Sequence, residues 1–193
     1  MLKNLDNYKI LLASQSPRRK ELLSQLGISF ETIILHGIDE SYPKSISVEE
    51  VAEFISIKKS EAFASVIKDN ELVITADTVV VCDNDVLGKP ANYLDAIEML
   101  KKLSGRIHKV ITGVTISTKK KTRSFSVSTD VEFASITNEE IEYYVENYKP
   151  YDKAGAYGIQ EWIGYMGIKG IKGSFYNVMG LPVQRLYALL KTF

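Results

Sequence analysis

The junction between an apolar run and a helical pattern near the N-terminus constrains the fold more than any other segment. It reads Lys9-Ile-Leu-Leu-Ala-Ser-Gln-Ser-Pro-Arg-Arg. The apolar run at 9–13 has the composition of a strand, and the spacing at 17–26 is typical of a helix. Ser16 is a favourable N-cap residue, and Pro17 suits the first helical turn because its missing N–H costs nothing there. The sequence therefore predicts a strand that leads directly into a helix.

Two arginines follow the predicted N-cap, at a helix end where free backbone N–H groups attract anions. The guanidinium groups of Arg18 and Arg19 add positive charge and planar pairs of donors, which match phosphate oxygens. This chemistry predicts a phosphate site at the end of the first strand.

Strand-type and helix-type segments alternate along the rest of the chain. Strands are predicted at 28–35, 71–75, 78–82, 109–117 and 124–134. Helices are predicted at 47–67, 92–103, 137–148 and 182–190, with capping boxes at Ser47 and Thr137 and an N-cap at Asn92. We expect residues 76–77 to interrupt the flanking strands and residues 119–123 to form an exposed hairpin turn. Interleaved helices and strands with central hairpins indicate an α/β fold with a mixed sheet.

Charge and cysteine usage narrow the choice of partners and compartment. Lys plus Arg and Asp plus Glu both number 24, whereas nucleic-acid binders usually carry a basic excess, so we expect no nucleic acid polymer as a partner. The single Cys82 lies in an apolar run and is interpreted as a small core residue of a protein in a reducing compartment. No segment resembles a signal peptide or reaches the roughly 20 apolar residues of a membrane span. We therefore expect a cytoplasmic chain with no membrane contact.

Asp77 is the second feature that draws attention, because a carboxylate stands inside Leu-Val-Ile-Thr-Ala-Asp-Thr-Val-Val-Val. An unpaired buried charge is very costly, so Asp77 needs a partner. In one interpretation it caps a turn or pairs with a lysine. In the other it faces a cleft at a strand end, where it holds a divalent cation or takes a proton from water. The sequence leaves both alternatives open.

Three more charged side chains are candidates. Glu40 lies in a predicted loop, where most carboxylates are simply solvated. Lys89 stands between a glycine and a proline, which fix the backbone around one cation and can present it to an anion. Lys59 lies in the middle of a predicted helix and fits either a surface or a site.

Several well-known motifs are absent. The sequence contains no P-loop, no Gly-x-Gly-x-x-Gly after a strand, no Gly-x-Ser-x-Gly elbow and no Cys/His zinc pattern. His36 and His108 lack metal-ligand spacing and are expected to be ordinary loop or strand-edge residues. Phosphate chemistry would therefore use the arginine turn together with carboxylates and a metal ion.

Six blocks carry a resemblance to a known family. They are 12–19 (Leu-Ala-Ser-Gln-Ser-Pro-Arg-Arg), 76–80 (Ala-Asp-Thr-Val-Val), 88–90 (Gly-Lys-Pro), 112–114 (Thr-Gly-Val), 151–160 (Tyr-Asp-Lys-Ala-Gly-Ala-Tyr-Gly-Ile-Gln) and 170–182 (Gly-Ile-Lys-Gly-Ser-Phe-Tyr-Asn-Val-Met-Gly-Leu-Pro). Each block is a weak signal alone, but together, in this order, they cover nearly the whole chain. The sequence resembles the Maf family of nucleoside triphosphate pyrophosphatases.

The resemblance implies a single Maf-like domain over residues 1–193. Its fold would be similar to that of Maf and HAM1 proteins, with an elongated, twisted mixed sheet flanked by helices and a central cleft between two lobes. It also implies a cytoplasmic homodimer, a house-cleaning enzyme of nucleotide metabolism that uses Mg²⁺ or Mn²⁺ to convert a nucleoside triphosphate to the monophosphate and pyrophosphate. The glycine-rich segment 155–180 would be either a mobile cover on the cleft or a set of tight turns against the sheet.

Within the family, the Gly-Ile-Gln ending of block 151–160 resembles the subgroup that acts on dTTP and UTP. The specificity residues of that subgroup fall on Arg18, Thr78 and Gln160. Thymine and uracil present an N3–H donor beside carbonyl acceptors, and a carboxamide offers both an acceptor and a donor to that edge. Cytosine would leave one of these partners mismatched, at a cost of about 1–3 kcal/mol if buried.

The expected mechanism is attack of water on the α-phosphorus, with pyrophosphate as the leaving group. Asp77 would bind the metal and accept the water proton, and Glu40 would complete the carboxylate set. The remaining candidates would bind substrate or neutralise phosphate charge; they are Ser14, Ser16, Arg18, Arg19, Lys59, Lys89, Thr78 and Gln160. The adjacent Lys58 also fits the lysine of the family's helix, and we assign that role to Lys59.

Two alternatives stay open at this point. A nucleotide-binding regulatory module that affects cell division could use the same serine and arginine turn without turnover. A pyrophosphatase for modified nucleotides, such as 5-methyl-UTP or pseudo-UTP, would share the mechanism and differ only in the base pocket.

Overall fold

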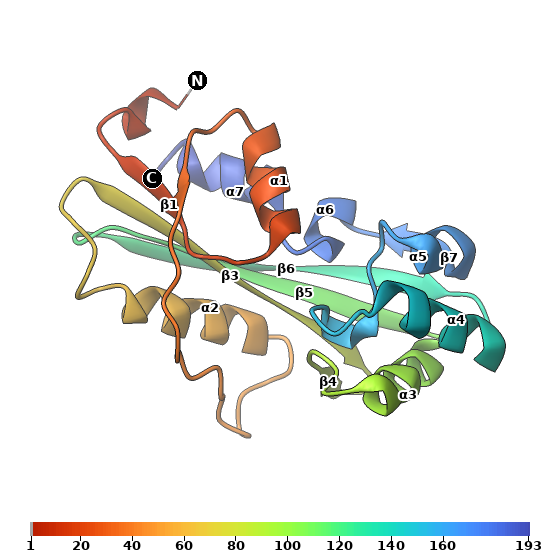
Figure 1. The fold of residues 1–193 in the computed structure, drawn as a ribbon. Helices are drawn as coiled ribbons and strands as arrows, with labels where there is room; N and C mark the ends of the chain where they lie inside the picture. The colour runs from red at the N-terminus through yellow and green to blue at the C-terminus, as the bar shows by residue number, and fades with distance from the viewer. Residues whose placement is uncertain (1) are drawn as a thin grey trace. The chain divides into compact units, whose positions relative to one another are not determined.

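The computed structural model describes residues 2–193 and shows strands and helices interleaved along the chain (Figure 1). The strands are β1 (Lys9–Leu12), β2 (Glu31–Thr32), β3 (Glu71–Cys82), β4 (Asp85–Leu87), β5 (Ile107–Ser117), β6 (Thr122–Phe133) and β7 (Ile168–Lys172). The helices are α1 (Pro17–Gln25), α2 (Val51–Ala62), α3 (Tyr93–Leu103), α4 (Asn138–Tyr148), α5 (Trp162–Gly167), α6 (Phe175–Val178) and α7 (Val183–Leu190), with 3₁₀ turns at Lys3–Leu5 and Ala154–Ala156.

Hydrogen bonds join the seven strands into a mixed sheet. Its order is β2-β1-β3-β5-β6-β7, with β4 beside β3. The pairs β1–β2 and β1–β3 are parallel, whereas β3–β4 and β6–β7 are antiparallel. The predicted α/β fold with a mixed sheet is confirmed. None of the helices in residues 2–193 combines the length and the hydropathy needed to cross a membrane.

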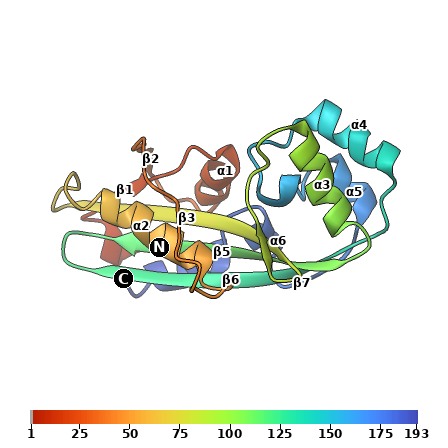
Figure 2. The same cartoon turned by 90° about the horizontal axis from the view of Figure 1, so that it is seen from below.

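The chain divides into two compact units. Unit 1 contains residues 2–77, 112–127 and 180–193, and unit 2 contains residues 78–111 and 128–179. In unit 1, α2 lies on one side of the strands, and α1 and α7 lie on the other (Figures 1 and 2). The side chains of Leu11 and Val73 on the strands pack with Phe63 and Ile67, which follow α2.

Unit 2 has its own hydrophobic core. Helices α3 and α4 supply the buried residues Leu100, Leu103 and Val145, which cluster with Val80 of β3 and Phe133 of β6. Because Thr78 begins this unit, the second half of β3 is embedded in the unit 2 core.

Local sequence chemistry correctly predicts the starts of α3 and α4. The Asn92 side chain accepts a hydrogen bond from the Asp95 N–H at 3.0 Å and caps α3. Thr137 and Glu140 form the predicted capping box at the start of α4. Asp83 and Asn84 adopt left-handed backbone conformations, with φ of 52° and 65°, which close a tight turn between β3 and β4.

Three predicted boundaries are wrong. β3 runs unbroken from Glu71 to Cys82, so Ala76 and Asp77 do not interrupt it. β2 contains only Glu31 and Thr32 rather than the predicted residues 28–35, and α2 spans only Val51–Ala62 rather than residues 47–67. The Ser47 hydroxyl does bond to the Glu50 carboxylate, but this contact forms in the turn before α2.

His108 is also a correction. It is not a strand-edge residue, because it lies inside β5 with 1% of its surface exposed. Its Nε2 lies 2.8 Å from the Tyr157 hydroxyl, and its ring meets Phe133 and Tyr157 edge to face. Cys82 is buried as predicted.

Candidate functional site

The start of α1 is a capped helix end that follows β1 directly. Ser16 is the N-cap, and its Oγ accepts a hydrogen bond from the Arg19 N–H at 3.4 Å. The buried Ser14 Oγ accepts from the Ser16 N–H at 3.2 Å, so two hydroxyls shape the turn after β1. Pro17 occupies the first helical position, and Arg18 stands half-buried beside it.

Arg19 ties this turn to two other parts of unit 1. Its Nε donates to the Gly180 carbonyl at 2.8 Å, and its Nη1 donates to the Ala76 carbonyl at 2.9 Å. Burial lowers the pKa of the Arg19 guanidinium, and the nearby Asp77 carboxylate acts in the opposite direction. Through Ala76, the start of α1 is held beside the part of β3 that carries Asp77.

Helix α2 approaches the sheet closely along a stripe of small residues. This stripe consists of Ala52, Ser56 and Ser60, which are four residues apart and all buried. Ser56 Oγ lies 2.8 Å from Thr115 Oγ1, and Ser60 Oγ donates to Ser117 Oγ at 2.7 Å.

The same helix is held to β3 and β5 by two further contacts. Thr75 Oγ1 of β3 donates to the Ser56 carbonyl at 2.7 Å. A Cβ atom placed on Gly113 of β5 would lie only 2.3 Å from the Ala52 backbone. Because the hydrogen bonds are directional and the approach at Gly113 leaves no room for even a methyl group, the position of α2 along the sheet is closely defined.

Lys59 extends from this helix to two carboxylates. Its Nζ lies 2.7 Å from Asp77 Oδ1 and 3.0 Å from Glu40 Oε1. The Lys59 and Asp77 side chains are 15% and 14% exposed, whereas Glu40 is 52% exposed. Lys58 makes a separate pair with Asp39 at 2.9 Å. Asp77 therefore has a lysine partner and also faces a partly open cluster, so both interpretations of this carboxylate are compatible with the structure.

Unit 2 holds the other three predicted site residues. Thr78 follows Asp77 on β3, and Lys89 is exposed in the loop after β4. The Gly155 N–H, five residues before Gln160, donates to the carbonyl of Gly88 at 3.0 Å. Gly155 also packs so tightly against β3 that a Cβ on it would lie 2.8 Å from Val80. The segment that carries Gln160 thus contacts the neighbours of Lys89 and the strand that carries Thr78.

Gln160 shows one unusual feature. Its Oε1 atom is buried, and it has no hydrogen-bond partner among residues 2–193. A buried carbonyl oxygen without a donor costs free energy, so native proteins rarely leave one unmatched.

Sequence reasoning did not single out a hydrogen-bonded group around Gln160. The Tyr144 hydroxyl, the Glu161 carboxylate and the Lys153 ammonium are connected, and Lys153 is only 8% exposed. A signal was available in the sequence, because Lys153 precedes Ala-Gly-Ala-Tyr-Gly-Ile, a stretch of small and apolar residues in which a lysine requires a buried partner.

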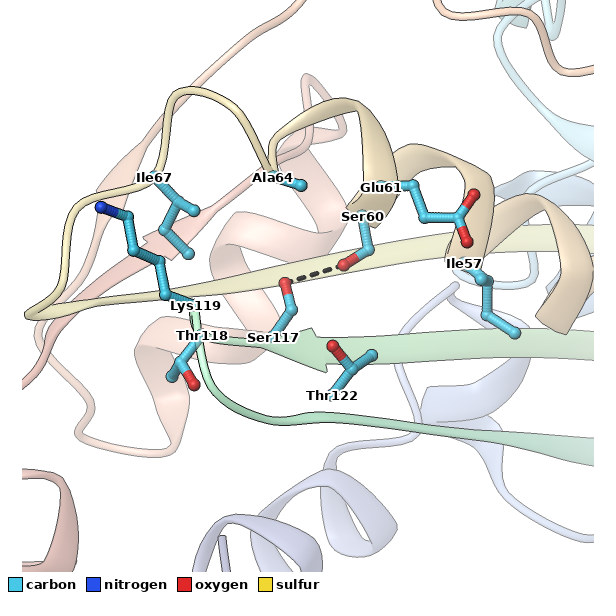
Figure 3. A pocket seen from close by; sticks show the side chains of 9 residues that line it. All are labelled: Ile57, Ser60, Glu61, Ala64, Ile67, Ser117, Thr118, Lys119 and Thr122. Carbon is cyan, nitrogen blue, oxygen red and sulfur yellow. Dashed lines mark hydrogen bonds between the residues drawn. The ribbon is translucent and has the colours of Figure 1, made fainter.

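Unit 1 also contains a pocket of about 440 Å³ between the second half of α2 and the β5–β6 turn (Figure 3). Figure 3 shows the Ser60 and Ser117 hydroxyls hydrogen-bonded to each other among the lining side chains, which include Lys119 of the turn and Thr122 at the start of β6. None of the ten predicted site residues lines this pocket. Seven of the ten belong to unit 1 and three to unit 2.

The chain is similar in sequence to a known protein family and to several full-length proteins. The family model described as Maf-like protein matches residues 9–193. A dTTP/UTP pyrophosphatase from Phocaeicola vulgatus is 57% identical over 191 residues, which cover 99% of each chain. A dTTP/UTP pyrophosphatase from Parabacteroides distasonis is 58% identical over 193 residues, which cover 100% of each chain.

One solved structure supports the fold. The structure of a HAM1 protein from Coxiella burnetii matches 96% of this chain and 100% of that chain with a TM-score of 0.50 and 13% identity. This likeness concerns the fold alone. With a family model over almost the whole chain and full-length relatives above 50% identity, the resemblance seen in the sequence is confirmed, and the chain belongs to the Maf-like protein family.

Proposed function

We propose that this chain is an enzyme that hydrolyses dTTP and UTP to the monophosphate and pyrophosphate. The names of its full-length relatives support this activity. The observation that carries the proposal is the cluster in which Lys59 Nζ lies 2.7 Å from Asp77 and 3.0 Å from Glu40. This cluster belongs to the same unit as the serine and arginine turn, which suits a triphosphate.

Asp77 is the proposed general base, and it takes a proton from the water that attacks the α-phosphorus. Its backbone is held within β3, and its carboxylate is oriented by Lys59. A base held in this way needs little reorganisation when the reaction occurs. Lys59 and Lys89 neutralise charge that develops on phosphate oxygens, while Ser14, Ser16 and the arginine pair hold the triphosphate.

The carboxylates of Asp77 and Glu40 suit a divalent cation. Both supply the hard oxygen atoms that Mg²⁺ and Mn²⁺ prefer, and they already stabilise one positive charge, the Lys59 ammonium. Residues 2–193 contain no group of three or more His, Cys, Asp and Glu side chains placed to share an ion, so water and phosphate would complete the coordination. When bound, the ion would polarise the phosphate oxygens.

The residues proposed to recognise the base are Arg18, Thr78 and Gln160. The buried Oε1 of Gln160, which lacks a partner in the described chain, can accept the N3–H of thymine or uracil. Cytosine has a lone pair at the same position and would leave that oxygen unmatched. The proposed preference for dTTP and UTP over CTP follows from this difference.

Replacement of the proposed base tests the mechanism. Asp77→Asn keeps the shape of the side chain but cannot accept the proton, so kcat for pyrophosphate release from dTTP should fall roughly 10²–10⁴-fold. Asp39→Asn is the matched control, because Asp39 pairs with the neighbouring Lys58 in the same way. Wild-type kcat in Asp77→Asn would refute the assignment.

A Gln160→Glu variant with an unchanged substrate profile would remove Gln160 from the base pocket.

The rival regulatory module needs no base and no metal, so metal-dependent pyrophosphate release distinguishes the two functions. A screen of normal and modified triphosphates, including 5-methyl-UTP and pseudo-UTP, would identify the preferred base. We also propose a homodimer in the cytoplasm. The single buried Cys82 suits a reducing compartment, and sedimentation equilibrium would measure the oligomeric state.

A further inference from the structure

Residues 158–161 form a turn, and Gln160 is one of its two central residues. The Glu161 N–H donates to the Gly158 carbonyl at 3.0 Å, which closes the turn, and the Gly158 N–H donates to the Tyr144 hydroxyl at 3.0 Å. A Cβ on Gly164 would lie 1.8 Å from the Ile159 carbonyl oxygen, so helix α5 supports the turn from beneath. The turn is therefore held at the residues on both sides of Gln160.

The buried hydroxyl group of Tyr144 is the hydrogen-bond partner that holds this turn. Tyr144 is fully buried on α4, and its O–H donates to Glu161 Oε2 while its oxygen accepts from Gly158. Burial and the bond to Glu161 raise the pKa of the Tyr144 hydroxyl, so it keeps its proton and remains a donor. Tyr144 thus bonds to both ends of the turn.

Lys153 holds the other oxygen of the same carboxylate. Its Nζ lies 3.1 Å from Glu161 Oε1 and 2.7 Å from Asp152 Oδ1. A Cβ on Gly158 would lie 2.8 Å from the Glu161 carboxyl carbon, so the carboxylate packs directly against the Gly158 backbone. Both oxygens of Glu161 are therefore fixed, and the carboxylate in turn supports the backbone that precedes Gln160.

We infer that Tyr144, Lys153 and Glu161 form a positioning triad that sets the orientation of Gln160 and thereby the choice of pyrimidine base. The inference rests on the proposed function, in which Gln160 Oε1 accepts the N3–H of uracil or thymine. None of the three residues needs to touch substrate. Their effect passes through the backbone of the turn, so it should alter recognition of the base and leave the chemical step at the α-phosphorus almost unchanged.

Tyr144→Phe is the sharpest test, because it removes one oxygen atom and keeps the ring that stacks on Tyr148 at 5.0 Å. We expect KM for UTP to rise roughly tenfold, the discrimination between UTP and CTP to fall by a similar factor, and kcat to stay within about twofold. Tyr143→Phe is the matched control. Tyr143 lies next to Tyr144 on α4, but it is 48% exposed and contacts Trp162 through its ring. The UTP/CTP selectivity of Tyr143→Phe should therefore equal that of the wild type.

A merely structural role would lower stability and reduce activity on all nucleotides equally. If Tyr144→Phe fails to fold, Glu161→Gln provides the second test, because its amide oxygen still accepts from Tyr144 while the charge pair with Lys153 is lost. Unchanged UTP/CTP selectivity in a folded variant would overturn the inference, provided that the wild-type chain is active. A wild-type chain that releases no pyrophosphate from either nucleotide would instead refute the proposed function.

Discussion

The contact between Gly113 and helix α2 leads to a quantitative prediction for Gly113→Ala. The new Cβ would lie 2.3 Å from the carbonyl carbon and oxygen of Ala52 and from the N atom of Glu53. Non-bonded heavy atoms normally stay about 3.5–4.0 Å apart. Since the opposing atoms belong to the backbone and cannot rotate away, α2 must move away from β5 by roughly 1 Å.

This movement would reach the proposed catalytic cluster. Lys59 lies on the displaced helix, and its contacts to Asp77 and Glu40 are 2.7 and 3.0 Å long, so a shift of that size would break or weaken them. Overpacking of this kind costs about 1–3 kcal/mol of folding free energy. A displacement of about 1 Å in a site can lower the rate roughly 100-fold. We therefore expect a folded variant with much reduced kcat/KM for dTTP.

The assay compares pyrophosphate release and urea unfolding of Gly113→Ala with those of a matched control. Gly170→Ala is suitable, because a Cβ on Gly170 of β7 would make only an ordinary contact of 3.8 Å with Glu132 Oε2. The control should keep both the wild-type rate and the wild-type stability. If Gly113→Ala shows wild-type kcat/KM, then α2 does not position Lys59 for catalysis, and the reasoning is refuted.

Three further predictions concern pH, the arginine turn and metal removal. Burial lowers the pKa of His108 to about 4 from its ordinary 6.5, so between these values only the unfolded chain binds the proton. The free energy of unfolding should therefore fall as the pH drops from 6.5 to 4, by a total on the order of 3 kcal/mol. In urea unfolding, the free energy of unfolding of His108→Gln should depend less steeply on pH than that of the wild type. Equal slopes would contradict this explanation. Arg19→Lys should lose the two bonds to the carbonyls of Ala76 and Gly180 and be less stable by about 1–3 kcal/mol, and an unchanged melting temperature would argue against their importance. Chelation with EDTA should stop pyrophosphate release, and added Mg²⁺ should restore it, without a change in the circular dichroism spectrum; full activity in EDTA would exclude the proposed metal.

Parts of the fold that depend on neighbouring residues could be predicted from the sequence. Asn92 and Thr137 cap helices through side chains that reach only three residues along the chain. Ser16 does the same at α1, and for that reason the sequence alone predicts the strand-to-helix junction. In each case the partner is within the same short segment.

The features that were missed depend on distant partners. Asp77 lies within a continuous strand because Lys59, 18 residues away, pairs with its carboxylate. This ion pair stabilises the charge without a break in the strand that would expose it to solvent. His108 is buried because Tyr157, 49 residues away, supplies a hydrogen bond. No local pattern indicates such partners, and for the same reason sequence reasoning could nominate Gln160 but not the triad that supports it.

The small-residue stripe on α2 has a consequence for mutational scanning. Ala52 and Ser56 are completely buried where the helix packs on the sheet, and the Ala52 backbone lies directly against Gly113, so larger side chains at these two positions have no free space to enter. A deep mutational scan scored by activity should therefore find these positions intolerant, although neither of them is proposed to contact a nucleotide. From the activity scores alone, these positions would be mistaken for active-site residues. A parallel scan scored by protein abundance would distinguish them from Asp77, because substitutions on α2 should lower abundance as well as activity.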